Sequence, residues 1–214
     1  MQVRSSFAIA AIAGLSLAAE CSDATSIGGN GTLAVRLTDA PFPLDSVKSV
    51  DVFVVRVDVR QGDATDSTAA QTDATDTTVT TSEARDGWQT IAKPDSLINL
   101  LTLQNGASTA LGQASLKAGT YHAMRLVIDP DSSSITLLDG TVLTSKSTPG
   151  ILFPSAAQSG IKVFFTQPLD VTANATTTAT ADFDVGQSFV LRGASITSAG
   201  LSFKPVVRMK SVTQ

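Results

Sequence analysis

The chain has 214 residues, of which 43% are hydrophobic and 16% are charged, and its formal net charge is −4. This length fits one domain with short appendages, and the hydrophobic content is sufficient for a proper core. No stretch is rich in lysine and arginine, so the sequence lacks the electrostatic basis for capturing nucleic acid. We therefore expect no nucleic-acid partner.

The first 21 residues have the pattern of an export signal. Arg4 supplies a positive charge, residues 7–17 are apolar, and small residues then lead to Cys21. The apolar segment is too short to span a bilayer and fits a signal peptide. Because "LAAEC" resembles the lipobox of bacterial lipoproteins, in which the cysteine is acylated, we predict lipid attachment at Cys21. Residues 22–31 then suit a flexible tether.

Glu20 departs from the lipobox pattern, in which a small residue precedes the cysteine. The alternative is ordinary cleavage after Ala18, which would give a secreted or periplasmic protein with a free thiol. Cys21 is the single cysteine, so no disulfide can form within the chain. An unpaired thiol is a liability in an oxidising compartment. We therefore expect a protein that is lipid-anchored to the cell envelope, at the outer membrane or cell surface.

A single β-rich domain is predicted over residues 32–214, because apolar residues alternate from Thr32 onward. The buried parity changes between the valines of 50–54 and those of 57–59. A strand cannot change its buried parity without an extra residue, so we predict a β-bulge near Val55 and Arg56. A segment that is buried on both faces is the alternative.

Two connecting segments stand out between these runs. The segment "DAPFPLD" over 39–45 contains two prolines, which fix φ and lack an N–H, so we predict a stiff connector outside the sheet. Residues 61–87 consist mainly of Thr, Ala, Asp and Ser, with scarcely any large apolar side chain. Such a composition predicts a long, mobile acidic loop between two strands.

Further short strands are predicted along the rest of the chain, over 87–92, 98–106, 111–116, 117–129, 134–144, 161–165, 176–185, 188–192 and 201–210. In the run that contains Met124, the alternation places His122 on the core face and Tyr121 on the opposite face. Asp139-Gly140 joins two of the runs and is suited to a type I′ hairpin, which needs positive φ at both positions.

No segment after residue 21 sustains a helical apolar stripe over three turns. About nine or ten short strands with Gly, Pro and Asp between them predict an all-β fold, an antiparallel two-sheet β-sandwich. With no helices to cover a sheet, its apolar face must pack on a second sheet. A closed β-barrel is the alternative.

Several ordered motifs resemble one known family. They are "GTLAVRLTDAPFPLDSVKSVDVFVVRVDV", "GWQTI", "LLTLQNG", "LGQASLKAGTYHAMRLVID", "TADFDVGQSFV" and "FKPVVRM". Together they resemble the bacterial and archaeal domain of unknown function 4382, from about Gly31 to Met209. The resemblance implies a β-rich domain of exported, often lipid-anchored proteins. The family has no assigned activity, so it supplies no catalytic residues.

The sequence offers little for catalysis. His122 is the single histidine, it lies on the predicted core face, and no Gly-x-Ser-x-Gly motif is present. Zinc sites prefer several His or Cys ligands, which are lacking. We therefore expect no enzymatic activity. A hydrolase is a distant third candidate, after the non-enzymatic binding or structural module and the Ca²⁺-stabilised module that are described below.

Paired aspartates are candidate ligands for a hard cation. Such pairs occur at Asp39 and Asp45, Asp129 and Asp131, and Asp182 and Asp184. Aspartate is also a common turn residue, because it hydrogen-bonds its own backbone. Turn capping without a cofactor is the main interpretation, and a Ca²⁺ site at Asp39, Asp45, Asp129 and Asp131 is the alternative.

Trp88 and Tyr121 are candidate glycan contacts, since aromatic rings stack on sugars, although lone aromatics more often pack into a core. The sequence thus favours a cell-envelope lipoprotein that acts as a non-enzymatic binding or structural module. The alternative is a Ca²⁺-stabilised carbohydrate-binding or adhesion-type module. The expected partners are the membrane, through an N-terminal lipid, and an unknown envelope protein or glycan.

Overall fold

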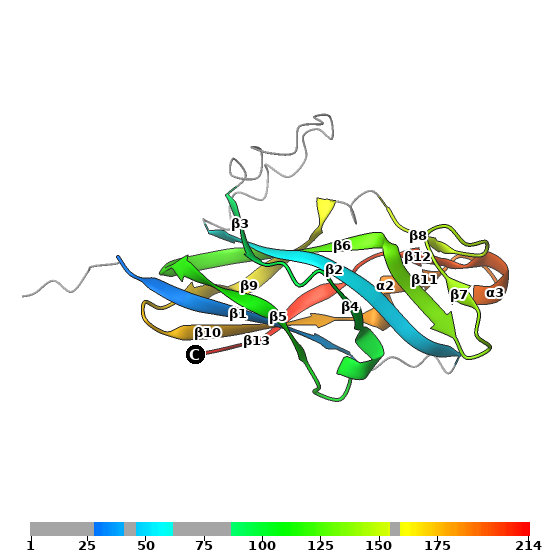
Figure 1. Ribbon diagram of the computed structural model, residues 1–214, viewed down its shortest axis with the longest axis horizontal. Helices are drawn as coiled ribbons and strands as arrows, with labels where there is room; N and C mark the ends of the chain where they lie inside the picture. The colour runs from blue at the N-terminus through cyan, green and yellow to red at the C-terminus, as the bar shows by residue number, and fades with distance from the viewer. Residues whose placement is uncertain (1–27, 41–45, 62–86, 155–158) are drawn as a thin grey trace, which may run out of the picture.

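A computed structural model describes residues 28–40, 46–61, 87–154 and 159–214. These residues form thirteen strands in three open sheets, of which the two larger sheets form a β-sandwich (Figure 1). The predicted β-sandwich is confirmed, and the closed barrel is not the architecture. The described residues contain more strands than the nine or ten expected, and two of the strand pairs are parallel.

The four-stranded sheet has the order β13-β10-β1-β5 and is called sheet A. Its strands are β1 (Asn30–Asp39), β5 (Thr109–Lys117), β10 (Thr176–Phe183) and β13 (Val207–Thr213). β1 is parallel to β10 and antiparallel to β5. Because β1 already begins at Asn30, the sheet includes two residues that were assigned to the tether.

The six-stranded sheet, called sheet B, is built on two long antiparallel strands. These are β2 (Val47–Gln61) and β6 (Gly119–Leu137). The shorter strands are β3 (Trp88–Ala92) and β4 (Ser96–Asn99), which pair with β2, and β7 (Val142–Leu143) and β9 (Ile161–Val171), which pair with β6.

The smallest sheet, called sheet C, has the order β11-β12-β8. Its strands are β8 (Ile151–Leu152), β11 (Phe189–Leu191) and β12 (Leu201–Phe203). Three helical turns of four residues each complete the elements described here: η2 (Leu100–Leu103), α2 (Val185–Ser188) and α3 (Ile196–Ala199). Within the described ranges, no helix has the length and apolar character needed to cross a membrane.

The core lies between sheets A and B, and the alternation of the strands creates it. Leu33, Val35 and Leu37 of β1 are at most 1% exposed, and the alternate residues of β10 through Phe183 are buried as well. The valines of β2 belong to the same cluster of buried side chains. Alternation with a period of two therefore places one apolar face of each sheet against the other.

The predicted bulge in β2 is confirmed. The register between β2 and β6 shifts between Val54 and Arg56, which leaves Val55 without a paired residue. The shift moves the buried parity, so that Val54 and Val57 are both fully buried.

The ends of the acidic segment lie side by side, because Arg60 of β2 pairs with Trp88 of β3. Residues 61–87 thus connect two adjacent antiparallel strands, as expected. Residues 62–86 themselves lie outside the described residues, as do residues 1–27 and 41–45. The export signal, most of the tether and the proline-containing connector therefore remain predictions.

The predicted orientation of Tyr121 is wrong. Its side chain is 1% exposed, whereas His122 is only half-buried. The register with β9 shifts between Tyr121 and Ala123, and the consecutive residues Ala123 and Met124 are both buried, so the buried parity changes between them. Tyr121 therefore joins the core, and its hydroxyl donates a hydrogen bond to the carbonyl of Lys117 (2.9 Å).

Three other details differ from expectation. The predicted strand over 98–106 ends at Asn99, because the Asn99 side chain accepts the N–H of Leu101 and begins η2. At Asp139-Gly140, positive φ occurs at Gly140 and not at Asp139, which excludes a type I′ turn. Residues 204–206 separate β12 from β13, so the predicted run 201–210 is two strands in two sheets.

Candidate functional site

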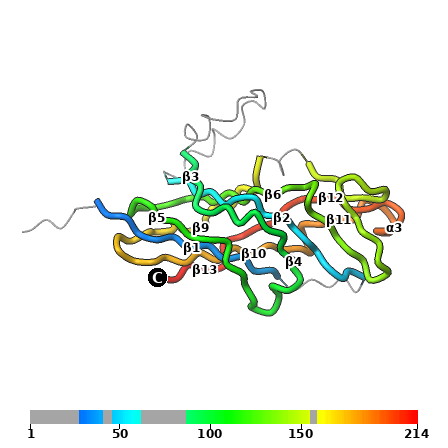
Figure 2. The backbone as a smooth tube through the Cα atoms, viewed as in Figure 1, coloured from blue at the N-terminus to red at the C-terminus, as the bar shows by residue number. Residues whose placement is uncertain are grey.

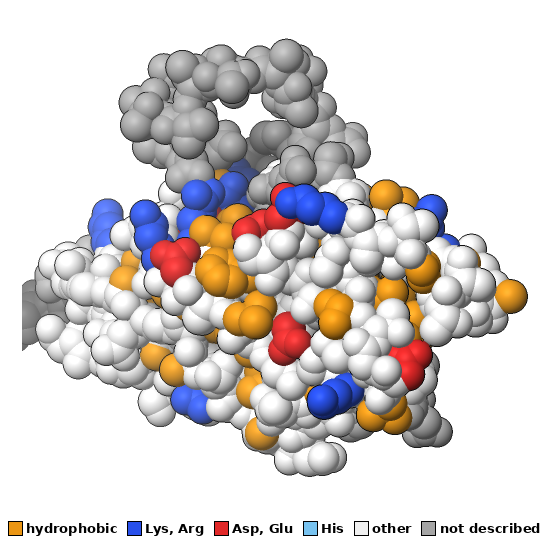
Figure 3. All heavy atoms as spheres, turned by 45° about the vertical axis from the view of Figure 1, so that its right-hand side comes forward, with side chains coloured by type: hydrophobic (Ala, Val, Ile, Leu, Met, Phe, Trp, Pro, Cys, Tyr) orange, Lys and Arg blue, Asp and Glu red, His pale blue; other side chains and the backbone are white. Residues whose placement is uncertain are grey.

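A polar cleft lies at one end of the molecule, beside sheet C. Its walls are the β7–β8 connection, β8, the start of the β11–β12 connection and α3. Figures 1 and 2 show that β1 begins at one end of the long axis, whereas β8, β11 and α3 lie at the other. We call this the tip cleft. Figure 3 is turned so that the tip end comes toward the viewer.

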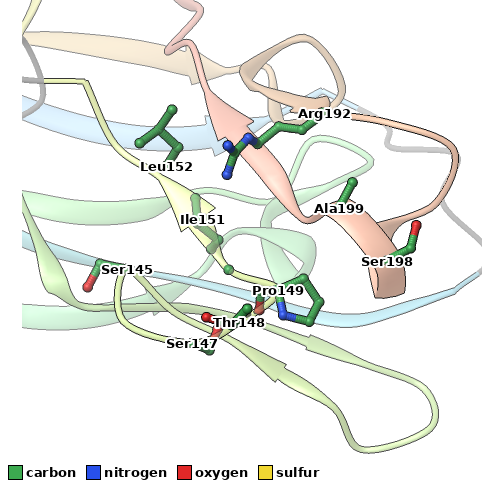
Figure 4. A pocket seen from close by; sticks show the side chains of 10 residues that line it. Ser145, Ser147, Thr148, Pro149, Ile151, Leu152, Arg192, Ser198 and Ala199 are labelled. Atoms are coloured by element: carbon green, nitrogen blue, oxygen red, sulfur yellow. Dashed lines mark hydrogen bonds between the residues drawn. The ribbon is translucent and has the colours of Figure 1, made fainter.

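The tip cleft has a volume of about 220 Å³. Ten residues line it: Ser145, Ser147, Thr148, Pro149, Gly150, Ile151, Leu152, Arg192, Ser198 and Ala199. Along the loop the hydroxyl residues come first and the aliphatic side chains of β8 follow, and Arg192 approaches from across β12 (Figure 4). The volume is below the roughly 300–1,000 Å³ of typical small-molecule sites, so it fits one ring or one side chain of a larger ligand.

The loop that forms one wall of the tip cleft is held by its own hydrogen bonds. The Ser147 hydroxyl accepts the N–H of Thr144 (2.9 Å) and donates to the carbonyl of Pro149 (2.8 Å). The Thr144 hydroxyl accepts the N–H groups of Ser147 and Lys146. Such side chain to backbone bonds fix a turn without a regular strand, so this wall is formed before any ligand binds.

Two glycines let this loop pack directly against β12. A Cβ atom added to Gly200 would lie 2.2 Å from the carbonyl oxygen of Gly150, and Gly200 has a φ of +73°. A Cβ added to Gly150 would lie 2.2 Å from the carbonyl oxygen of Ser147. Backbone contact this close requires glycine at both positions. The N–H of Leu201 donates to Gly150 O (3.0 Å), which joins β12 to the loop.

Sheet C is attached to the core through an aromatic cluster around Phe203. The Phe203 ring lies 5.0 Å from Phe189, 5.1 Å from Phe153 and 6.2 Å from Phe183, between ring centroids. Phe183 and Phe203 are fully buried. Such aromatic contacts bury large areas in fixed geometry, so the tip cleft is part of the folded domain rather than an appendage.

Arg192 is the single charged residue of the tip cleft. It is exposed, and its guanidinium makes no hydrogen bond or ion pair with any residue that the structure describes. Asp131, whose carboxylate accepts the hydroxyl of the lining residue Ser145 (2.7 Å), pairs with Lys146 instead (2.9 Å). The tip cleft therefore has an unused positive charge in a chain whose net charge is −4.

The lining of the tip cleft combines one cation with neutral groups. None of its ten residues is a carboxylate, a histidine or a cysteine. Its hydroxyl groups come from Ser145, Ser147, Thr148 and Ser198. The tip cleft therefore offers a cation, hydroxyls and aliphatic surface.

A second, similar cleft of about 260 Å³ lies where the edge strands of sheets A and B meet. Residues 166–168 of β9 and 209–212 of β13 line it. Its single charged residue is Lys210, which is exposed on the edge strand of sheet A. Two edge strands alone form this cleft, whereas a loop, the strand β8 and residues around α3 form the tip cleft.

A charged network lies on the outer face of sheet B. Asp58 is 1% exposed, and one of its oxygens contacts the guanidinium groups of Arg125 (2.6 Å) and Arg56 (3.1 Å). The Thr90 hydroxyl donates to the other oxygen (2.7 Å). Arg125 also lies over the ring of Trp88, 4.9 Å from its centroid, in a cation–π contact.

Cross-strand register creates this network. Asp58 is directly opposite Arg125 on β6 and Thr90 on β3, so the three side chains share one face. Gly160 makes room for the Arg125 side chain, since an added Cβ would lie 2.6 Å from Arg125 Cγ. Because each oxygen of Asp58 is bound by residues of the same sheet, we assign the network a structural role.

Trp88 and Tyr121, the candidate glycan contacts, are both occupied within the fold. Tyr121 is a core residue, and burial raises the pKa of its hydroxyl. Trp88 is half-buried, with one ring face covered by Arg125. The structure brings neither ring to the tip cleft.

Asp39 is a buried carboxyl at the end of β1. One of its oxygens accepts the N–H of Val185 (3.2 Å), and the other accepts the side-chain amide of Gln104 (3.3 Å). Burial raises the pKa of Asp39 to about 6, and the nearby carboxylates of Asp182 and Asp184 add to this shift. Asp39 thus connects β1 to α2, as a cap.

The other candidate calcium ligands are spread over the molecule. Asp129 accepts the N–H of Asp131 (2.9 Å) and the hydroxyl of Ser132 (2.6 Å) within its own bend of β6. Asp131 is paired with Lys146. Asp45 lies outside the described residues, which contain no group of three or more metal-ligating side chains.

The remaining aspartate pair is divided between two environments. Asp184 accepts the N–H of Gln187 (3.0 Å) and caps α2. One oxygen of Asp182 is buried without a hydrogen-bond partner in the described part of the chain.

Comparison with known proteins identifies a family. The model of a domain of unknown function, DUF4382, matches residues 30–205. The chain belongs to the DUF4382 family. No curated protein and no solved structure matches the chain. In this DUF4382 domain the matched region includes the tip cleft and the Asp58 network, and it ends within the segment that separates β12 from β13.

Sequence reasoning missed the two main polar features of this DUF4382 domain. Arg56, Asp58 and Arg60 share one parity of β2, and this charged alternation could have indicated a polar sheet face opposite the valines. The tip cleft gave a weaker signal: a run of hydroxyl residues over 144–148 and, far along the chain, one arginine at 192.

Proposed function

We propose that this protein is a lipid-anchored, non-enzymatic binding module of the cell envelope, and that its ligand binds in the tip cleft. The observation that carries the proposal is the position of this preformed cleft. It lies at the end of the long axis opposite the start of β1 (Figure 1). A chain attached through Cys21 and a tether that precedes β1 would present the cleft away from its anchor.

Two properties support binding over catalysis. The lining lacks an acid, a base and a nucleophilic thiol, and its loop is held by the hydrogen bonds of Thr144 and Ser147. Preorganised sites lose little conformational entropy when they bind.

Filling the tip cleft tests the binding function. Thr148 is exposed in the lining, so Thr148→Trp would obstruct the cleft without disturbing the core. In a thermal-shift screen against Ca²⁺, EGTA, glycans and envelope-derived peptides, a ligand at a hundred times its Kd raises stability by about 2.7 kcal/mol. We expect at least one organic ligand that stabilises the wild type but not Thr148→Trp.

Thr176→Trp is the matched control, because Thr176 is exposed at the start of β10, outside the tip cleft. A ligand that shifts all three proteins equally, or a flat response across the panel, would contradict the proposed binding function. If the protein chemically converted any compound of the panel during incubation, the proposal that it is not an enzyme would be contradicted.

The anchor is tested separately with Cys21→Ser. We expect the wild type to incorporate labelled palmitate and to sediment with membranes, and the variant to do neither. A variant that remains acylated and membrane-bound would refute lipid attachment at Cys21, while leaving the binding function open to its own test.

A further inference from the structure

The tip cleft also indicates the chemical class of its ligand. We infer that it binds the carboxylate-bearing sugar residue of an acidic polysaccharide, with Arg192 as the carboxylate-binding residue. This inference rests on the proposed binding function and adds the ligand class. Its first basis is the guanidinium of Arg192, which points over β12 toward Ile151 and Leu152 (Figure 4).

The charge of Arg192 has no partner in the described part of the chain. A guanidinium has five N–H donors in a planar arrangement that matches a carboxylate in a bidentate contact. The nearby acid, Asp131, is already bound by Lys146 and Ser145, which leaves Arg192 available. The lining has no carboxylate that would repel an anion.

The rest of the lining matches the remaining parts of a sugar. Thr148 has an exposed hydroxyl, and the Ser145 oxygen, which donates to Asp131, can still accept a hydrogen bond. Ile151 and Leu152 provide an aliphatic surface, and Leu152 is 53% exposed. Sugar rings combine hydroxyl edges with weakly apolar C–H faces, which suits a lining that has hydroxyl groups beside an aliphatic surface.

The size of the tip cleft favours one residue of a polymer. Its volume of about 220 Å³ accommodates a single ring, and the cleft is open to solvent, so the rest of a polymer can remain outside it. The position at the far end of the molecule from β1 also suits a polymer outside the membrane surface.

The test is isothermal titration of the full chain with a galacturonic acid hexamer. The hexamer is compared with its methyl-esterified form, a neutral glucose hexamer, a hexaglutamate peptide and inorganic sulfate. At 50 mM salt we expect the galacturonic acid hexamer to bind with a Kd below about 1 mM. The methyl ester, which keeps the ring but loses the charge, should bind at least tenfold more weakly, and 500 mM salt should also weaken binding.

Arg192→Gln should reduce affinity for the galacturonic acid hexamer at least tenfold, and Arg192→Lys should give an intermediate loss, because lysine keeps the charge but not the bidentate geometry. Arg208→Gln, an exposed arginine on β13, is the matched control and should bind normally. Since Arg192 is exposed and unpaired, its variants should keep the thermal midpoint of the wild type.

Absence of binding by the acidic hexamer, equal binding of its methyl ester, or unchanged binding by Arg192→Gln would each overturn the inference. If hexaglutamate or sulfate bound and the galacturonic acid hexamer did not, the acidic polysaccharide would also be rejected as the ligand. In either case a neutral ligand whose thermal shift depends on Thr148 would still support the proposed binding function, so the two failures are distinguishable.

Discussion

Two carboxyl groups are buried to the same extent in this protein, but in opposite electrostatic surroundings. Asp39, at the end of β1, and Asp58, within β2, are each 1% exposed. Asp58 contacts two guanidinium groups, whereas the hydrogen-bond donors to Asp39 are a backbone N–H and a side-chain amide. A buried carboxylate needs either an opposite charge or a proton, and the two sites represent these two solutions.

The difference arises from the strand register. Asp58 lies in the middle of sheet B, where the residues opposite it on β3 and β6 supply Thr90 and Arg125. Asp39 lies where β1 ends, near Asp182 and Asp184, which are like charges. A central strand position thus offers partners on both sides, whereas the end of the strand leaves Asp39 to neutral donors.

The largest effect is expected from Asp58→Ala. This substitution leaves Arg125, whose side chain is 11% exposed, without its ion pair. Breaking a buried pair by removing one partner costs about 3–5 kcal/mol in the free energy of unfolding. Urea denaturation measures this loss.

Asp51→Ala, on the same strand, is the matched control. Asp51 accepts one hydrogen bond from Ser49 (2.6 Å), so its loss should cost about 1 kcal/mol. If the free energy of unfolding fell by the same small amount in both variants, the ion pairs of Asp58 would not stabilise the fold.

A smaller effect of opposite sign is expected from Asp39→Asn. The folded protein keeps a proton on Asp39 up to about pH 6, while the unfolded chain releases it near its ordinary pKa of 3.8. The folded state therefore binds more protons between these values, and the contribution of Asp39 to stability is full below pH 3.8 and is lost as the pH rises through 6. The loss amounts to about 3 kcal/mol.

An asparagine keeps a carbonyl oxygen for the N–H of Val185 and does not titrate. Asp39→Asn should therefore be more stable than the wild type at pH 7, by up to about 3 kcal/mol, and similar to it near pH 4. Urea denaturation at both pH values measures the difference. A variant that is less stable at pH 7 would show that the charged form of Asp39 is favoured in the fold.

The smallest effect is expected at the exposed pair of Asp131 and Lys146, whose side chains are 58% and 74% exposed. Hydrogen bonds from Lys146 and Ser145 lower the pKa of Asp131. In Lys146→Ala this pKa should rise toward its ordinary value, as carbon-detected NMR titration would show. The thermal midpoint should not change, because exposed pairs contribute little. A clear drop in the thermal midpoint would show that this exposed pair contributes to stability as the Asp58 network does.

The sequence predicted the parts of the fold that depend on alternation alone. The parity change in β2 could be read from the valines, and the bulge at Val55 was found where it was expected. Between Ala123 and Met124 the same principle failed, because both residues are apolar and the sequence shows no visible parity change there. Tyr121 was therefore assigned to the wrong face.

Features that depend on distant partners could not be read from the sequence. Asn99 ends β4 through its own side chain, which a propensity for strands does not reveal. The tip cleft joins the loop before β8 to Arg192, and only the pairing of β8 with β12 brings them together. Of the aspartates considered as alternative calcium ligands, Asp39 lies on β1 and Asp129 and Asp131 lie on β6, and local donors bind Asp39 and Asp129 in line with the main interpretation of turn capping.

Because β1 is parallel to β10, sheet A joins residues 144 positions apart, such as Thr32 and Thr176. Pairings between such distant residues form slowly, since the intervening chain must first be ordered. β13 reaches the sheet through β10, so sheet A is complete only when the chain through Thr213 is available. The fold therefore depends on its last strand, and sheet A cannot close around the first strand until nearly the whole chain has been synthesised.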